Sequence, residues 1–200
     1  MALSKIDGTN FIAPTIPTSV GGTGSTAATL PASLINNTSI GNVTALPGAI
    51  ATGKVLQVVS AIKTDTQTLD SADWTDISGL TVDITPAATS SKILVLGHIT
   101  TASGNHGHTR CVRGSTVIGA GVAAGSRGAV SGYANSNGNS ANVQPFVFLD
   151  SPNTTSSTTY HFELESNNSS ASYINRTPND TDAIYGSRGS STITVMEIGA

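Results

Sequence analysis

The clearest pattern in this chain is a series of short apolar runs that begins at Lys54. In residues 158–166 (TTYHFELES), apolar and polar residues alternate, which is typical of a strand with one buried and one solvated face. The runs are rich in β-branched residues and bounded by turn residues, without helical periodicity. They predict strands at 54–64, 74–77, 80–84, 92–101, 109–113, 115–119, 129–133, 143–150, 158–166, 172–176 and 190–198.

The number and spacing of these strands predict the fold class. Short strands joined by turn-rich links are typical of antiparallel sandwiches and jelly rolls. We therefore expect residues 54–200 to form an all-β, jelly-roll-like, two-sheet antiparallel β-sandwich. Long Gly/Ser/Asn segments at 119–128 and 135–142 are expected as loops, and loops of this length are usually functional or packed against a neighbour.

Residues 1–53 have a different character. Four of the prolines and a Gly-Gly-Thr-Gly run at 21–24 disfavour regular secondary structure. Unlike a low-hydrophobicity tail, the segment also contains spaced apolar residues that can dock on a partner. We therefore predict an extended N-terminal arm over residues 1–53, ahead of the sandwich domain over residues 54–200. The expected anchor residues are Phe11, Ile12, Ile16, Leu30, Leu34 and Ile35.

Composition narrows the range of partners. Charged residues make up 10% of the chain and the net charge is −3, with Lys and Arg scattered singly. Without a basic stripe to neutralise a phosphate backbone, nucleic acid is not an expected partner. No apolar run approaches a bilayer-spanning length and the N-terminus lacks a signal-peptide pattern, so we expect synthesis in the cytoplasm without membrane insertion. The single cysteine, Cys111, is expected as a buried apolar residue.

The chain offers little protection for its sheet edges. Few lysines lie on the predicted strands, and aromatic residues make up only 4% of the chain. Unguarded edges risk pairing between sheets unless another chain covers them. Burial between subunits would also add to a core built mainly from aliphatic residues. We therefore expect the domain to oligomerise, with a homotrimer closed about a threefold axis as the predicted state.

Three patterns suggest chemistry, but the sequence favours a structural interpretation of each. Residues 60–63 (SAIK) match a Ser-x-x-Lys pattern, yet they lie on a predicted strand rather than at a helix N-terminus. Residues 22–27 (GTGSTA) imitate a dinucleotide fingerprint, yet prolines precede them where a strand is required. Five acids are expected as turn and surface residues rather than a glycosidase pair: Asp65, Asp70, Asp73, Asp76 and Asp83. We predict no catalytic residue, no cofactor and no enzymatic activity.

His106 and His108 form the candidate metal pattern. On an extended segment, His-x-His points both imidazoles to the same side. Three copies around a threefold axis would place six nitrogens for an octahedral transition metal. The segment Ser-Gly-Asn-His-Gly-His-Thr is expected to form an exposed loop, and most surface histidines bind nothing, so a polar loop without a metal is the favoured interpretation.

Several motifs carry a resemblance to a known group of proteins. Residues 19–26 (SVGGTGST) resemble the Gly-Gly-Thr-Gly motif near the front of phage tail-fibre proteins, and residues 39–47 (SIGNVTALP) resemble their linker repeats. The C-terminal part is similar to the β-sandwich domains of fibre and virion-decoration proteins of tailed bacteriophages. The matching segments there are 54–59 (KVLQVV), 74–80 (WTDISGL), 91–99 (SKILVLGHI) and 113–119 (RGSTVIG).

This resemblance implies a trimeric, non-enzymatic structural protein on the virion surface. It would be a fibre or a capsid-decorating (cement) protein, attached by residues 1–53 to the major capsid protein or to a tail adaptor, with head or tail left open. The alternative is a receptor-binding adhesin of the tail that recognises host surface glycans. Its possible glycan contacts are Tyr133, Asn135, Tyr173 and Arg176. A depolymerase is disfavoured, because no carboxylate pair stands out among the acids.

Overall fold

The computed structural model describes residues 54–136, 138–167 and 170–199. These residues are all-β, as predicted, and they contain no helix long and apolar enough to cross a membrane. The strands are β1 (Val55–Lys63), β2 (Gln67–Leu69), β3 (Thr75–Ile84), β4 (Lys92–Ser103), β5 (His106–Arg113), β6 (Thr116–Ile118), β7 (Gly132–Ala134), β8 (Asn142–Asp150), β9 (Thr158–Asn167), β10 (Ser172–Ile174) and β11 (Ser191–Ile198). The arm predicted at 1–53 and its six anchor residues lie outside the described ranges and stay a prediction.

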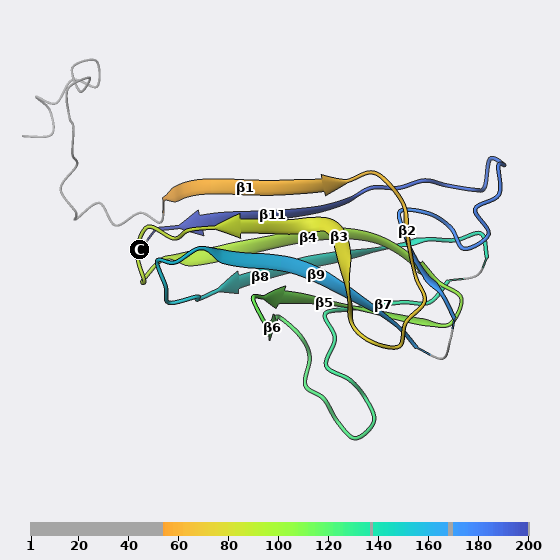
Figure 1. The fold of residues 1–200 in the computed structure, drawn as a ribbon, viewed down its shortest axis with the longest axis horizontal. Coiled ribbons are helices and arrows are strands. Elements are labelled where there is room, and N and C mark those ends of the chain that lie inside the picture. The colour runs from red at the N-terminus through yellow and green to blue at the C-terminus, as the bar shows by residue number, and fades with distance from the viewer. Residues whose placement is uncertain (1–53, 137, 168–169, 200) are drawn as a thin grey trace, which may run out of the picture. The chain divides into compact units, whose positions relative to one another are not determined.

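The strands form two antiparallel sheets, arranged as two layers (Figure 1). One sheet has six strands in the order β1-β11-β4-β10-β2, with β8 also paired to β4. The other has five strands in the order β3-β9-β5-β6, with β7 also paired to β5. This arrangement confirms the predicted two-sheet sandwich. The long segment between β6 and β7 projects away from it as a loop.

Alternation along the strands builds the core between the two sheets. In β9, Tyr160, Phe162 and Leu164 are buried, while the residues between them face outward. β11 buries every second residue in the same way from the opposite sheet. Each fully buried apolar side chain contributes on the order of 1.5–3 kcal/mol, so these two facing surfaces supply most of the stabilising free energy. The core cluster is Leu69, Ile77, Leu80, Val82, Ile84, Ile93, Val95, Ile99, Cys111, Ile118, Phe146, Tyr160, Phe162, Leu164, Ile174, Ile193 and Val195.

A glycine in β4 accommodates a large ring from the facing sheet. Gly97 lies at an inward position, and the Phe162 ring fills the space that a Cβ at Gly97 would take. Phe162 also meets Phe146 of β8 edge to face, with ring centroids 5.5 Å apart. A small residue on one sheet thus interlocks with a large residue on the other, as close packing of a protein interior requires.

β3 differs from the sequence prediction. The sequence predicts separate strands at 74–77 and 80–84, but one strand runs through both. Its pairing with β9 is irregular between Asp76 and Thr81. Gly79 has a φ of 81° there, a conformation that glycine adopts readily. The Ser-Gly pair at 78–79 is therefore a bulge within one strand rather than a turn between two.

Three short strands also differ from the prediction. β2 was not predicted, because it is only three residues long and alternation cannot reveal so short a strand. The strand predicted at 129–133 pairs with β5 only from Gly132 onward, because the preceding residues belong to the projecting loop. The strand predicted at 172–176 ends at Ile174, because Asn175 has a φ of 60°.

The His106-Gly107-His108 segment is a strand, not the predicted loop. It forms the first residues of β5, which pairs with β9 on one side and with β7 on the other. Backbone hydrogen bonds from two neighbouring strands hold these residues extended despite the glycine. Tertiary pairing therefore overrides the local preference for a turn.

Asn175 joins the ends of three strands in the six-stranded sheet. Its backbone N–H donates to the Thr100 carbonyl at 2.9 Å. Its side-chain amide donates to the carbonyls of Lys63 and Asp65, both at 2.9 Å, and accepts from the Ser191 hydroxyl at 2.6 Å. Asn175 is fully buried, and its left-handed backbone is one that Asn tolerates better than most residues. These hydrogen bonds satisfy its polar atoms and fix β1, β4 and β11 relative to one another.

Glu197 plays a similar part at the end of β11. Its side chain is fully buried and accepts hydrogen bonds from Gln57 Nε2 at 2.6 Å and from the Ala87 N–H at 2.7 Å. Burial raises the pKa of Glu197, but the hydrogen bonds from Gln57 and the Ala87 backbone outweigh it. The net pKa lies below the ordinary value of 4.5. The ionised carboxylate therefore stabilises the fold by tying β11 to β1 and to the β3–β4 connection.

We predict that Glu197→Gln lowers stability at neutral pH by about 1–3 kcal/mol, because one carboxylate acceptor becomes an amide donor. A depressed pKa in the folded state gives stability that is present above pH 4.5 and is lost as pH falls through the folded pKa. The wild type should therefore lose more stability than the variant on acidification. Urea unfolding between neutral and acidic pH measures this, with the exposed Asp182→Asn as the control. An unchanged acid profile in Glu197→Gln would contradict it.

Candidate functional site

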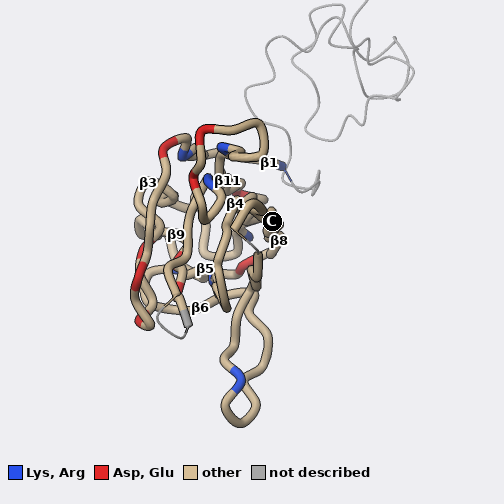
Figure 2. Tube along the Cα trace, turned by 90° about the vertical axis from the view of Figure 1, so that its right-hand side faces the viewer, with Lys and Arg blue, Asp and Glu red and all other residues tan. Residues whose placement is uncertain are grey.

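Charged and aromatic side chains gather on the outer side of the five-stranded sheet. In Figure 2 the acidic residues lie mostly on the side of β3 and β9. Alternation along the strands directs these charged and aromatic side chains outward, because the residues between them in the sequence fill the core. This surface, the charged face, consists of Trp74, Asp76, His106, His108, Arg110, Tyr133, His161, Glu163 and Glu165.

One row of the charged face crosses three strands. Asp76 of β3 is opposite Glu163 of β9, which is opposite Arg110 of β5. Arg110 Nε donates to Glu163 Oε2, and the guanidinium carbon lies 4.1 Å from the centroid of the Trp74 ring. His161 Nε2 lies 3.4 Å from Asp76 Oδ1 and 3.6 Å from Glu163 Oε1. This row therefore pairs Glu163 with a cation and covers the indole with the same cation.

The neighbouring row contains the His-x-His motif. His108 Nδ1 lies 2.7 Å from Glu165 Oε1, and His106 Nδ1 lies 2.7 Å from the Tyr133 hydroxyl. Both imidazoles face the Tyr133 ring, with centroids 5.8 and 5.6 Å away, so they lie on the same side of β5. Among the described residues, no third His, Cys, Asp or Glu atom joins this pair in a metal-sized group. A metal at His106 and His108 therefore stays a prediction.

The four residues predicted as glycan contacts form two separate pairs. Asn135 Nδ2 donates to the Tyr133 hydroxyl at 3.4 Å, so these two residues lie together beside the His-x-His motif. Arg176 lies over the ring of Tyr173, with its guanidinium carbon 4.0 Å from the centroid. Tyr173 belongs to β10 in the six-stranded sheet, whereas Tyr133 belongs to β7 in the other. The structure does not bring the four residues into one cluster.

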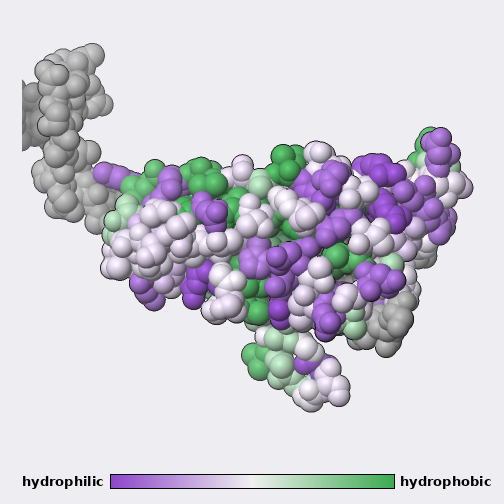
Figure 3. Space-filling view, viewed as in Figure 1, coloured by the Kyte–Doolittle hydropathy of each residue, from purple (hydrophilic) through white to green (hydrophobic). Residues whose placement is uncertain are grey.

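The outer side of the six-stranded sheet is chemically the opposite of the charged face. Each of β1, β4, β8 and β11 contains one charged residue, and of these only Lys92 is exposed. The other three, Lys63, Asp150 and Glu197, are buried. Figure 3 shows apolar side chains over β1 along the upper edge of the view. This surface, the apolar face, exposes Leu56, Val58, Ile62, Val143, Val147 and Leu149.

Strand register makes the apolar face continuous. One row of apolar residues crosses four neighbouring strands. In order, it contains Val58 of β1, Met196 of β11, Leu94 of β4 and Leu149 of β8. In the next row, Leu96 of β4 and Val147 of β8 continue this surface, and Val147 is 71% exposed. The same row has Ser60 in β1 and Thr194 in β11. A contiguous apolar surface of this kind on a soluble protein usually marks a binding surface.

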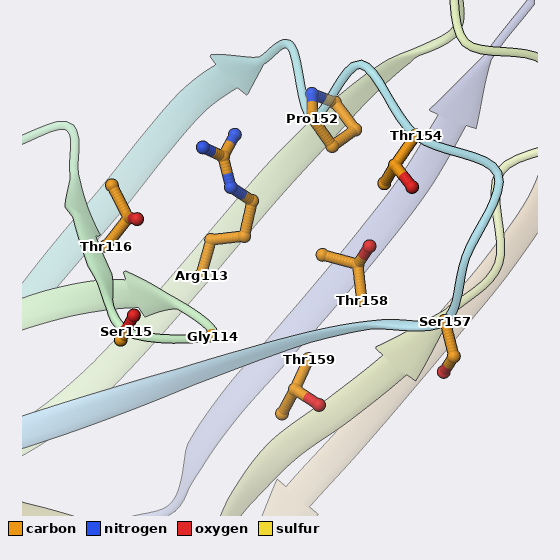
Figure 4. A pocket seen from close by; sticks show the side chains of 9 residues that line it. All are labelled: Arg113, Gly114, Ser115, Thr116, Pro152, Thr154, Ser157, Thr158 and Thr159. Atoms are coloured by element: carbon orange, nitrogen blue, oxygen red, sulfur yellow. The ribbon is translucent and has the colours of Figure 1, made fainter.

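A pocket of about 360 Å³ lies between the β5–β6 turn and the β8–β9 loop. Arg113 and several Ser and Thr side chains line it (Figure 4). Arg113 Nη1 donates to both oxygens of Asp150 at 2.8 Å, and the Tyr160 hydroxyl donates to Asp150 Oδ2 at 2.7 Å. Burial, together with the hydrogen bond to Asp150, raises the pKa of Tyr160. The Arg113 guanidinium thus pairs with the buried Asp150 carboxylate and offsets the loss of water around it.

The remaining chemical candidates have structural roles. Ser60 is exposed on β1 while Lys63 is buried, so the two ends of the Ser-x-x-Lys match point to opposite sides of the strand. Lys63 Nζ donates to Asp65 at 2.7 Å, and this hydrogen bond lowers the pKa of Asp65. Cys111 is fully buried, and burial raises its pKa to about 12, which agrees with the expected apolar role.

The sequence predicts Asp76 as a turn or surface acid and does not connect it with the outward residues of β9. The polar alternation of His161, Glu163 and Glu165 was the available signal, since it marks the solvated side of the strand. The partners across the sheet, including Arg110, follow only from register, which local alternation does not reveal.

Comparison with known proteins gives no family. No protein-family model matches the chain, and no curated protein matches it. Among solved structures, the chain is similar to one described as the structure of infectious bursal disease virus Gx strain, at 12% sequence identity and a TM-score of 0.35. The match covers 72% of this chain and 37% of that chain, so this chain spans well under half of its length. At these values the likeness identifies neither a family nor a function.

We predict that Arg110→Ala destabilises the protein by about 1–2 kcal/mol, because it removes the cation from the Trp74 ring and the hydrogen-bond donor from Glu163 Oε2. Trp74 is the single tryptophan of the chain, so its emission should shift to longer wavelength as the ring becomes exposed. Urea unfolding followed by fluorescence measures both effects. Arg127→Ala, in the projecting loop, is the matched control and should change neither. Unaltered emission in Arg110→Ala would show that the guanidinium does not cover the indole.

Proposed function

We propose that this protein is a non-enzymatic structural component of a tailed-bacteriophage particle, either a surface fibre or a capsid-decorating protein. In this proposal, residues 1–53 attach it to the major capsid protein or to a tail adaptor, and the sandwich is displayed outward as a homotrimer. The Gly-Gly-Thr-Gly and linker motifs in residues 1–47 support the attachment, by their resemblance to tail-fibre proteins. The two-sheet sandwich is compatible with it, although this architecture serves many functions.

The observation that carries the proposal is the apolar face. A surface that is exposed in one chain, continuous across four strands and almost free of charge is suited to burial against other copies. Closed cyclic symmetry would bury it in every subunit at once. A protein built to assemble in this way needs no catalytic residues.

A second candidate function is host recognition by a tail adhesin. The observation in its favour is Tyr133, which is 50% exposed on the charged face and is bordered by His106 and Asn135. An exposed aromatic ring with polar neighbours can stack on a sugar and accept or donate hydrogen bonds. Binding of purified protein to host cells that is lost in Tyr133→Ala would favour this function over a purely structural one.

We predict that deleting residues 1–53 leaves the sandwich folded but removes the protein from assembled particles. The core lies within the described part of the chain, whereas the predicted anchor residues lie in the deleted segment. Purified virions are analysed by quantitative mass spectrometry, with Phe11→Ser plus Ile12→Ser as a milder variant that should reduce incorporation. If the copy number of this protein scales with that of the major capsid protein, it is a decoration protein. If it scales with that of the tail proteins, it is a fibre. Normal incorporation of the truncated chain would refute attachment through this segment.

We predict that the full chain is a trimer in solution and that Val147→Asp weakens it more than about tenfold, because assembly would bury an unpaired carboxylate. Light scattering at micromolar concentration should give three times the 20.1 kDa chain mass for the wild type. Val122→Asp is the matched control, since Val122 is 94% exposed in the projecting loop. A monomeric wild type would refute the trimer, and a stable Val147→Asp trimer would place its interface elsewhere.

A further inference from the structure

Asp76, His161 and Glu163 form a compact group of potential ligands on the charged face. One ligand atom from each side chain lies within 4.8 Å of the other two. Asp76 comes from β3, while His161 and Glu163 come from neighbouring outward positions of β9. We propose that this group binds one divalent transition-metal cation of the zinc type, which cross-links β3 to β9.

The spacing of the ligand atoms fits zinc. His161 Nε2 lies 3.4 Å from Asp76 Oδ1 and 3.6 Å from Glu163 Oε1. Two ligands on a tetrahedral ion with bonds of about 2.0–2.2 Å are separated by about 3.4 Å. The imidazole nitrogen is therefore at coordination spacing from both carboxylates, so only small side-chain movements would bring all three atoms onto one ion.

Two of the ligands are already held in place. The side chains of His161 and Glu163 are 12% and 15% exposed, so the sheet restricts their rotamers. Arg110 holds Glu163 by its Oε2 atom, which leaves Oε1 directed at His161. A second contact of this kind orients a metal-binding carboxylate. Asp76 has a 70% exposed side chain and lies on the solvent side, where a cation can enter.

The charge of the group suits a cation. Two carboxylates, Asp76 and Glu163, face one cation, Arg110, and the imidazole of His161 is a ligand in its neutral form. Imidazole nitrogen and carboxylate oxygen are both ligands that zinc accepts, whereas Ca²⁺ and Mg²⁺ prefer oxygen alone. Three protein ligands leave a fourth position on a tetrahedral ion, which a water molecule would fill.

The position of the group gives the metal a structural task. The ladder between β3 and β9 is irregular from Asp76 to Thr81, so backbone pairing between these strands is interrupted beside the ligands. A cation bound to Asp76 on one strand and to His161 and Glu163 on the other would bridge this interruption. Binding to the folded state alone stabilises that state by mass action.

The test uses the full chain without a polyhistidine tag, stripped of metal with a chelator. Isothermal titration with Zn²⁺ should give one site per chain, and the thermal unfolding midpoint should rise with Zn²⁺ but not with Ca²⁺. His161→Asn and Asp76→Asn should each weaken binding more than about tenfold, because one of three ligands is removed. Asp76 is largely exposed, so its variant is expected to fold even if the His161 variant does not.

The chain has four histidines, His98, His106, His108 and His161, so a small set of variants assigns the site. His98→Asn, on the opposite sheet, is the matched control and should bind Zn²⁺ as the wild type does. Binding that survives in Asp76→Asn and His161→Asn but is lost in a His106→Asn, His108→Asn double variant would overturn the proposal in favour of the His-x-His motif. Failure of the wild type to bind Zn²⁺ would overturn it outright.

Discussion

Burial of one side of each sheet against the other is the constraint on which the rest of the structure depends. Because side chains alternate along a strand, the residues that fill the core decide which residues face outward. Phe162 and Leu164 enter the core, so Glu163 is directed away from it and toward Arg110. The charged face and the apolar face are both consequences of this single register.

The two outer surfaces differ because the six-stranded sheet turns most of its charges inward. Lys63, Asp150 and Glu197 are buried, each with hydrogen-bonding partners that offset the loss of water. These contacts stabilise strand ends and connections, and they leave the outer surface with little charge. An exposed apolar surface lowers solubility, which makes coverage by another chain the simplest physical account of its composition.

The charged face and the apolar face belong to opposite sheets, so the proposed metal and the proposed assembly surface are physically independent. A cation between β3 and β9 would act on the five-stranded sheet, beside its one interrupted ladder among the described strands. Assembly would act on β1, β4, β8 and β11. Substitutions on one surface can therefore be interpreted without assuming the role of the other.

Alternation in the sequence was enough to predict an all-β, two-sheet sandwich, the position of most strands and the outward direction of Glu163 in β9. These features are local, because the direction of a side chain depends only on its position along its own strand. The pairing of β5 with β7 and β9, which makes a strand of the His-x-His segment, was decided only by tertiary structure. Tertiary structure alone also brought Asp76 next to His161, and it placed Tyr133 and Tyr173 on different sheets. Register and neighbourhood arise from contacts between distant segments, which no local pattern encodes.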